Sequence, residues 1–145
     1  MTEMLDIKIE RVTRKNKAEF EKLLDKLWSG ATLEDCKTDA KKTMQFLCKL
    51  GGEYVGLITA SVRREHVAGR HGKKVCYLEG IYVLDEYKNK GIETEILAHF
   101  ENWARRKGIK EIASDCEIEN NASLNLHKKL GFSVVETTIH LKKNL

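Results

Sequence analysis

The sequence predicts an α+β fold (α/β mixed), in which about four helices flank a central mixed, mostly antiparallel sheet. Hydrophobic residues recur at every second position in some segments, which is typical of strands, and at helical spacing in segments between them. The 145 residues are 41% hydrophobic and 33% charged, which suits one packed core. We therefore expect residues 1–145 to form a single domain.

The first half of the chain is expected to form three strands and two helices. Alternation of apolar and polar residues predicts a strand over residues 7–12, and an apolar stripe at helical spacing predicts a helix over residues 20–28. A second helix is expected over residues 32–51, because its apolar residues also recur at intervals near one helical turn. Residues 53–67 and 75–84 have the composition of long strands, and the short glycine-containing loop between them predicts a hairpin.

The second half is expected to continue with alternating helices and strands. A helix over residues 91–108 has one apolar face and ends at a glycine. A strand over residues 109–116, a short helix over residues 122–130 and a last strand over residues 132–141 follow.

Composition excludes several classes of function. Lysine and arginine total 26 against 22 acidic residues, a net charge of +4, in short and separate clusters that are typical of solvated surfaces. No nucleic-acid partner is expected. The four cysteines and five histidines lack the paired spacing of metal ligands, so neither a metal nor a structural disulfide is expected. No apolar run reaches the roughly 18 residues that span a bilayer, and the N-terminus has no secretory pattern, so a cytoplasmic location is expected.

The junction between the strand at residues 75–84 and the next helix is the most informative segment. A loop with Lys88 and Lys90 leads into Gly91, where the helix is expected to begin. Such a junction presents free backbone N–H groups and the positive end of the helix dipole, a geometry that binds phosphate. The alternative is an ordinary helix start, because many helices begin after a glycine.

Several stretches resemble the GCN5-related N-acetyltransferases (GNAT superfamily). They are Leu-Glu-Gly-Ile-Tyr-Val-Leu at residues 78–84, the Lys-x-x-Gly loop at residues 88–91, and Leu-Gly-Phe at residues 130–132. Further stretches are similar to the aminoglycoside 6'-N-acetyltransferases of this superfamily. These are Leu-Trp at residues 27–28, Ser-Val-Arg-Arg-Glu-His-Val at residues 61–67, Glu-x-Trp-Ala at residues 101–104, Ala-Ser-Asp at residues 113–115, and Asn120 or Asn121 with Ser123 and His127.

The resemblance implies that acetyl-CoA is the cosubstrate and that a primary amine attacks its thioester directly. It places the thioester carbonyl near backbone N–H donors of the strand and the pyrophosphate at the loop and helix start. The cofactor-binding residues that it implies are Ile81, Tyr82, Val83, Lys88, Asn89, Lys90, Gly91, Ile92, Glu93, Thr94, Asn120 and Ser123.

Three residues are the candidates for proton transfer. The acceptor ammonium must lose a proton, and the carboxylates of Glu79 and Asp115 match the family positions for the base. The alternative for each is a solvated acid at a strand end. His127 stands where many members carry a tyrosine that protonates the departing thiolate, and its alternative is a packed helix histidine bonded to backbone.

The acceptor site that the resemblance implies is acidic with one aromatic wall. Trp28 is expected against the acceptor, although core packing is its alternative. The full set of implied acceptor-binding residues is Trp28, His66, Glu79, Asp115 and Glu136.

Two positions depart from the family pattern. Glu93 stands where the phosphate loop normally carries a small residue, so its charge is expected to oppose a bound pyrophosphate unless it only complements the helix dipole. His66 stands where the resembled enzymes tend to have a tyrosine.

The expected function is acetyl-CoA-dependent transfer of an acetyl group to a primary amine, most simply the 6'-amine of an aminoglycoside, which would confer antibiotic resistance. The alternatives are a GNAT enzyme for another small amine, and a non-catalytic GNAT-fold binding protein with a degraded CoA loop. The expected partners are a polycationic small-molecule acceptor and a second copy of the chain, paired through the strand at residues 132–141.

Overall fold

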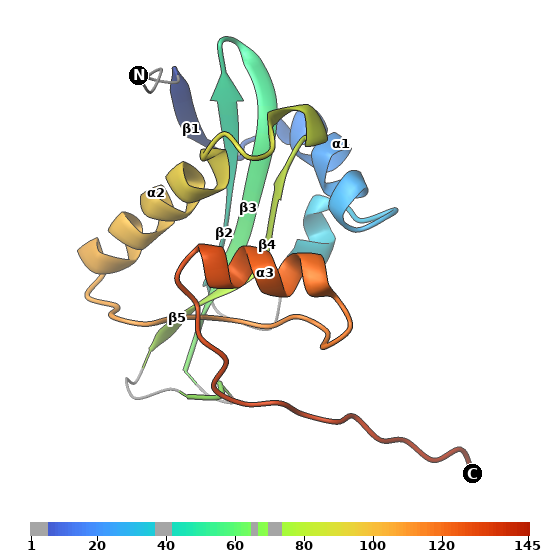
Figure 1. Cartoon of the computed structure of the whole chain (residues 1–145). Helices are drawn as coiled ribbons and strands as arrows, with labels where there is room; N and C mark the ends of the chain where they lie inside the picture. The colour runs from blue at the N-terminus through green and yellow to red at the C-terminus, as the bar shows by residue number, and fades with distance from the viewer. Residues whose placement is uncertain (1–5, 37–41, 65–66, 70–73) are drawn as a thin grey trace.

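A five-stranded sheet in the order β1-β2-β3-β4-β5 organises the computed structural model, which describes residues 6–36, 42–64, 67–69 and 74–145 (Figure 1). Neighbouring strands from β1 to β4 are antiparallel, and β5 joins the edge in parallel with β4. The expected mixed, mostly antiparallel sheet is therefore confirmed. The strands are β1 (Ile7–Arg11), β2 (Lys42–Leu50), β3 (Glu53–Arg63), β4 (Val75–Val83) and β5 (Ile112–Ser114).

Helices cover both faces of this sheet (Figure 1). Helix α1 (Lys17–Leu27) packs on one face of β3 and β4, and α2 (Ile92–Arg106) packs on the other. Helix α3 (Asn121–Lys129) lies beside β5, and 3₁₀ turns form at Leu33–Cys36 (η1) and Asp85–Tyr87 (η2). In the described part of the chain, no helix is both long and apolar enough to cross a membrane.

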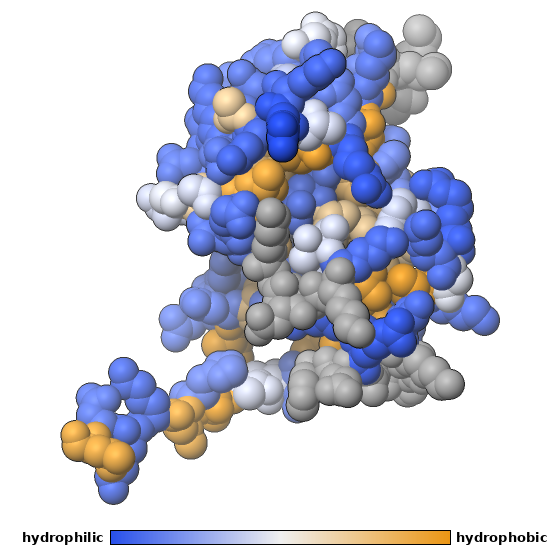
Figure 2. All heavy atoms as spheres, turned by 180° about the vertical axis from the view of Figure 1, so that it is seen from behind, coloured by the Kyte–Doolittle hydropathy of each residue, from blue (hydrophilic) through white to orange (hydrophobic). Residues whose placement is uncertain are grey.

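The last strand of the sequence prediction is absent. Residues 132–145 form neither helix nor strand, and Figure 2 shows them leaving the body of the molecule with hydrophobic side chains on display. The pattern that suggested a strand is present, because Val135, Ile139 and Leu141 lie two or four residues apart. Their exposed fractions are 68%, 80% and 89%. Alternating apolar and polar residues favour a strand, but a strand forms only where the edge of another strand pairs with its backbone N–H and C=O groups.

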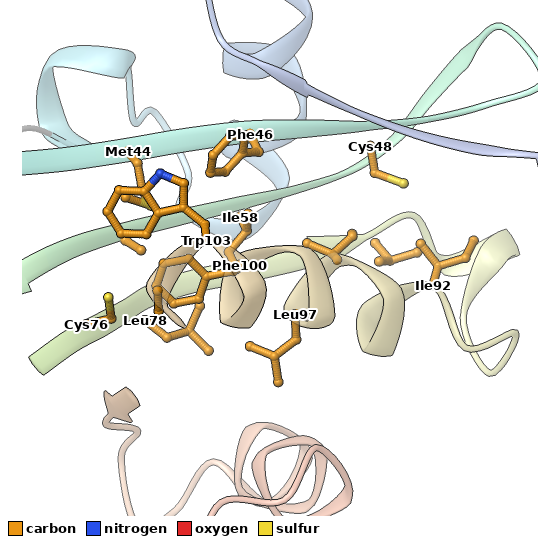
Figure 3. Close-up of a cluster of buried hydrophobic side chains, with 14 of the residues drawn as sticks. Met44, Phe46, Cys48, Ile58, Cys76, Leu78, Ile92, Leu97, Phe100 and Trp103 are labelled. Carbon is orange, nitrogen blue, oxygen red and sulfur yellow. The ribbon is translucent and has the colours of Figure 1, made fainter. Parts of the chain in front are cut away.

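Two hydrophobic clusters form the core, one on each face of the sheet. The larger cluster lies between the sheet and α2, where the rings of Phe100 and Trp103 stack on each other and pack against residues of β2, β3 and β4 (Figure 3). The smaller cluster lies under α1, where Phe20, Leu23 and Leu24 cover Leu57 of β3. Helix α1 thus supports the sheet from the side opposite to α2.

The predicted helix over residues 32–51 is wrong. It is replaced by η1 and by strand β2, with residues 37–41 outside the described part. Strand β2 is buried on both faces, since Met44 and Phe46 face the α2 cluster while Leu47 faces the α1 cluster. A strand buried on both sides loses the clear alternation that identifies half-exposed strands, and its apolar run resembles a helix.

Candidate active site

Strands β4 and β5 separate soon after they meet. Their parallel pairing is limited to Cys76–Leu78 with Ile112–Ser114, whereas β4 continues to Val83 beside β3. In the described structure, the stretch from Glu79 to Val83 therefore has a strand partner on the β3 side only. Along Ile81, Tyr82 and Val83, backbone N–H groups of alternate residues point away from β3 into this gap, where they can donate to a ligand carbonyl.

The loop before α2 has the backbone shape of a phosphate cradle. Asn89 and Gly91 have φ angles of 63° and 81°, which bend the chain through the left-handed region on the way to Ile92. No heavy atom lies within 4 Å of where a Gly91 Cβ would stand, so the approach to the helix start is open. The first N–H groups of α2 have no acceptor within the helix, and this end carries the positive pole of the dipole.

The charges around this cradle are mixed. The ammonium of Lys88 lies 2.7 Å from the carboxylate of Asp85, and that hydrogen bond raises the pKa of Lys88. The negative charge of Glu93, in the first turn of α2, acts in the same direction on Lys88. The ammonium of Lys90 lies over the ring of Tyr87. Both cations are therefore close to the loop, and so is the acid that departs from the family pattern.

Glu79 occupies a β-bulge on β4. Thr59 lies opposite Gly80 and Ala60 lies opposite Leu78, so Glu79 is the extra residue of the pairing. A bulge re-aims a side chain and is often found beside an active site. Here it brings the Glu79 carboxylate to β3, where the Ser61 hydroxyl donates a hydrogen bond of 2.7 Å.

Trp28 packs directly over Gly80, the residue that follows Glu79 on β4. A Cβ at Gly80 would stand 2.8 Å from the Trp28 ring and from a Leu27 methyl group, so any larger residue there would displace these side chains. The Trp28 ring is nevertheless 36% exposed. It therefore forms a partly open aromatic wall next to Glu79, in addition to its packing role.

The two candidate bases are linked by protein side chains. The Arg63 guanidinium forms an ion pair of 2.6 Å with Glu79, and its central carbon lies 3.7 Å from the centre of the Tyr77 ring. The Tyr77 hydroxyl donates a hydrogen bond to Asp115, directly after β5. Burial, followed by this hydrogen bond, raises the pKa of Tyr77, so the phenol keeps its proton and stays a donor. Glu79 is half-buried, whereas Asp115 is exposed.

His127 lies on the opposite side of β5 from this pair of acids. Its Nε2 lies 2.7 Å from the Ser114 hydroxyl, and its Nδ1 lies 2.7 Å from the backbone oxygen of Ser123. The next residue along the chain, Asp115, contacts Tyr77 instead. Side chains of successive residues in an extended chain point in opposite directions, so Ser114 and Asp115 contact partners on opposite sides of β5. The gap between β4 and β5 thus has the acids on one side and an imidazole on the other.

The remaining predicted residues have varied surroundings. The Asn120 side chain caps α3 by accepting from the Ser123 backbone N–H at 3.1 Å. Thr94 is exposed in the first turn of α2. Glu136 is exposed on the C-terminal segment and borders the same open groove as Asp115 and His127. His66 lies outside the described residues.

Sequence reasoning did not single out Arg63, Tyr77, Ser61 or Ser114. A signal for two of them was present, because Ser61 and Arg63 continue a line of polar residues on one face of an otherwise apolar strand. Tyr77 and Ser114 gave no such signal. Their roles depend on the register between β4 and β5, which the sequence alone does not fix. Among the described residues, no group of three or more His, Cys, Asp or Glu side chains is placed to hold a metal ion.

Comparison with known proteins shows the family of this chain. The profile described as the acetyltransferase (GNAT) family matches residues 9–132. The aminoglycoside N(6')-acetyltransferase type 1 of Salmonella typhimurium strain LT2 is 30% identical over 93% of this chain and 97% of that protein.

Two solved structures are also similar over almost their whole length. The aminoglycoside N-acetyltransferase AAC(6')-Iy in complex with CoA superposes with a TM-score of 0.86 at 28% identity, covering 100% of this chain and 99% of that one. AAC(6')-Iy in complex with the bisubstrate analogue CoA-S-monomethyl-acetylneamine superposes with a TM-score of 0.83 at 28% identity, covering 96% and 99%. With the profile match, these similarities show that the chain belongs to the acetyltransferase (GNAT) family.

Proposed function

We propose that this chain transfers the acetyl group of acetyl-CoA to the 6'-amine of an aminoglycoside. The observation that carries the proposal is the placement of two carboxylates, Glu79 and Asp115, beside the gap between β4 and β5. Carboxylates at that place can bind a cationic acceptor and accept its proton. The names of the similar proteins support the choice of acceptor.

The residues around the gap fit acetyl-CoA. Acetyl-CoA supplies an activated acetyl thioester when it is bound. The one-sided edge at Ile81, Tyr82 and Val83 would hold the thioester carbonyl, and the open start of α2 after Gly91 would hold the pyrophosphate. We also propose that Asn120 and Ser123, at the start of α3, contact the cosubstrate.

The side chains divide the proton transfers. Asp115, exposed and oriented by the Tyr77 hydroxyl, would take the proton from the acceptor ammonium, directly or through water. Glu79 and the Trp28 ring would position the acceptor, with His66 and Glu136 as further walls. His127, across the gap, would return a proton to the departing thiolate.

The test compares two aminoglycosides that differ at one position. Neomycin has an amine at the 6' position and paromomycin has a hydroxyl there, so their other contacts are matched. We expect release of CoA with neomycin and acetyl-CoA, and a rate at least a hundredfold lower with paromomycin. Equal rates would refute 6' transfer, and no release with any amine would refute the enzyme.

A non-catalytic binding protein is the second candidate, because Glu93 places a negative charge beside the proposed phosphate cradle. Thermal unfolding with acetyl-CoA separates the two functions. A ligand present at 100 times its Kd stabilises a fold by about 2.7 kcal/mol, so an enzyme shows a clear rise in Tm. No rise at millimolar acetyl-CoA would favour the binding protein.

A second acceptor class follows from the ion pair at Glu79. Because Arg63 already neutralises this carboxylate, an acceptor of lower charge, such as a short polyamine or an amino acid, is the alternative within the enzyme class. Acetyl transfer to spermidine with none to neomycin would decide for it.

The biological setting belongs to the same proposal. We propose that residues 1–145 work as one domain in the cytoplasm, bind small molecules rather than nucleic acid, and confer aminoglycoside resistance by removing a positive charge from the drug. We also propose a homodimer in which the segment at residues 132–145 joins the partner's sheet beside β5. The exposed, alternating apolar residues of this segment support that pairing.

A further inference from the structure

The Arg63 side chain fills a position where a cationic acceptor is expected. Its guanidinium makes the 2.6 Å ion pair with Glu79, and its Nε lies 3.4 Å from the Ser61 hydroxyl. The same group stacks on the Tyr77 ring at 3.7 Å. Stacking and pairing together fix a planar guanidinium better than either contact alone, because arginine uses its flat face and its edge at once.

This arginine stands between the two acids of the acceptor site. Glu79 contacts it directly, and Asp115 reaches it through the Tyr77 hydroxyl and ring. The side chain of Glu79 is only 18% exposed, so its charge needs a partner within the protein or from a ligand. In the structure, Arg63 provides that partner.

We propose that Arg63 is a specificity-determining residue: it takes the place of an acceptor ammonium beside Glu79 and so limits the affinity for polycationic acceptors. This inference rests on the proposed acceptor site. An ammonium that enters must either share Glu79 with the guanidinium or displace it. The Arg63 side chain is 32% exposed, so its guanidinium can move into solvent when an acceptor ammonium pairs with Glu79.

The proposal makes affinity depend on the charge at residue 63. Arg63→Gln removes the positive charge and keeps a planar polar group near Ser61. The Glu79 carboxylate then lacks a cationic partner until an acceptor supplies one. We expect the Kd for neomycin, measured by calorimetry without acetyl-CoA, to fall at least fivefold in this variant, with a smaller gain at high salt.

Arg64 offers a matched control. It is the neighbouring arginine, it is exposed, and Arg64→Gln changes the net charge by the same amount. This control should change neomycin affinity by less than twofold. A conservative variant, Arg63→Lys, keeps the charge and should stay within twofold of the wild type.

A double-variant cycle tests whether Glu79 is the group that Arg63 masks. In the background of Glu79→Gln, the gain from Arg63→Gln should vanish, because no carboxylate remains at residue 79 for the acceptor to bind. If Arg63→Gln fails to fold, Arg63→Met keeps an unbranched side chain beside the Tyr77 ring without the charge and should give the same gain. If folded Arg63→Gln and Arg63→Met bind neomycin no more tightly than Arg64→Gln does, the proposal is overturned.

This experiment also separates the inference from the proposed enzyme function. Binding without acetyl-CoA needs no turnover, so a gain in affinity with no acetyl transfer would uphold the role of Arg63 and refute the activity. Acetyl transfer by the wild type, with no gain in neomycin affinity in Arg63→Gln or Arg63→Met, would refute the role of Arg63 and uphold the activity.

Discussion

The Ser114 hydroxyl lies 2.7 Å from Nε2 of His127 and 3.0 Å from the carbonyl oxygen of Leu78. Since the other ring nitrogen faces the backbone oxygen of Ser123, Nδ1 must carry a proton. A protonated Nε2 can then donate to Ser114, which donates in turn to Leu78. Both ring protons of a charged His127 would therefore bond to the protein, so its action as an acid requires that the Nε2 proton leave the Ser114 hydroxyl for the thiolate.

The first prediction concerns this network. His127→Gln keeps a polar side chain but removes the acid, so kcat should fall about tenfold while the Kd for CoA stays within twofold. Ser114→Ala removes the acceptor for Nε2 and should give part of the same loss. The His127 ring also packs edge-on against Phe132, with 5.2 Å between the ring centres. If packing is its only role, both variants will instead lower the Tm and leave kcat unchanged.

The second prediction concerns the two acids. Asp115→Asn and Glu79→Gln should each lower turnover at least tenfold with little change in CoA affinity, because each removes a carboxylate that we propose acts on the acceptor rather than on CoA. Glu117→Gln, an exposed acid two residues beyond Asp115, is the matched control. Loss of CoA affinity with turnover intact would make Glu79 and Asp115 structural residues.

The sequence correctly predicted those helices and strands in which hydrophobic residues follow a single clear periodicity. Helix α2 and the hairpin of β3 and β4 were predicted correctly, since a single apolar face or a long run of strand-forming residues identifies them. Strand β2 was not, because both of its faces are buried. The predicted strand at residues 132–141 depends on a pairing partner, which local pattern cannot supply.

The site was predictable only in part for a related reason. Glu79 and Asp115 were identified by resemblance, and the structure places both beside the same gap. Their partners were not identified, because the bulge at Glu79 and the contact of Tyr77 with Asp115 arise from strand register. Register joins residues far apart in the sequence, and no local pattern encodes it.

The third prediction concerns the C-terminal segment. If it pairs with a second copy, the chain will sediment as a dimer, and the double change Ile139→Asp with Leu141→Asp will give monomers because it introduces charges into the apolar contact. Leu145→Asp, at the fully exposed end, is the control and should leave the dimer intact. A wild-type chain that sediments as a monomer even at a protein concentration 100 times that used in the activity assay would contradict the pairing.

The fourth prediction concerns pH. His99 on α2 packs edge-on against Phe46 at 5.1 Å, and burial, with the charge of Arg106 in addition, lowers its pKa below 6.5. The unfolded state therefore takes up this proton first as the pH falls through 6.5, so the free energy of unfolding decreases below that pH.

Denaturation with urea at a series of pH values measures this dependence. His99→Gln should flatten the fall of the unfolding free energy below pH 6.5, whereas His140→Gln, on the exposed C-terminal segment, should leave it unchanged. An identical slope in wild type and His99→Gln would show that other groups cause the acid sensitivity.

The fifth prediction concerns Glu93, and the first turn of α2 contains its own control. Glu93 and Glu95 both lie in that turn. The charge of Glu93 acts on Lys88 in the loop, whereas that of Glu95 acts on Cys48 in β2, where burial and this charge raise the thiol pKa to about 11. The two acids therefore face different sides of the helix start.

Like charges about 5 Å apart at an effective dielectric constant near 20 repel by about 3 kcal/mol. Glu93→Ala should therefore tighten CoA binding at least tenfold, and the gain should be smaller at high salt. Glu95→Ala removes the same charge from the same helix end and should change the Kd by less than twofold. If the two variants bind CoA alike, Glu93 only complements the helix dipole, and the departure from the family pattern has no effect on the cosubstrate.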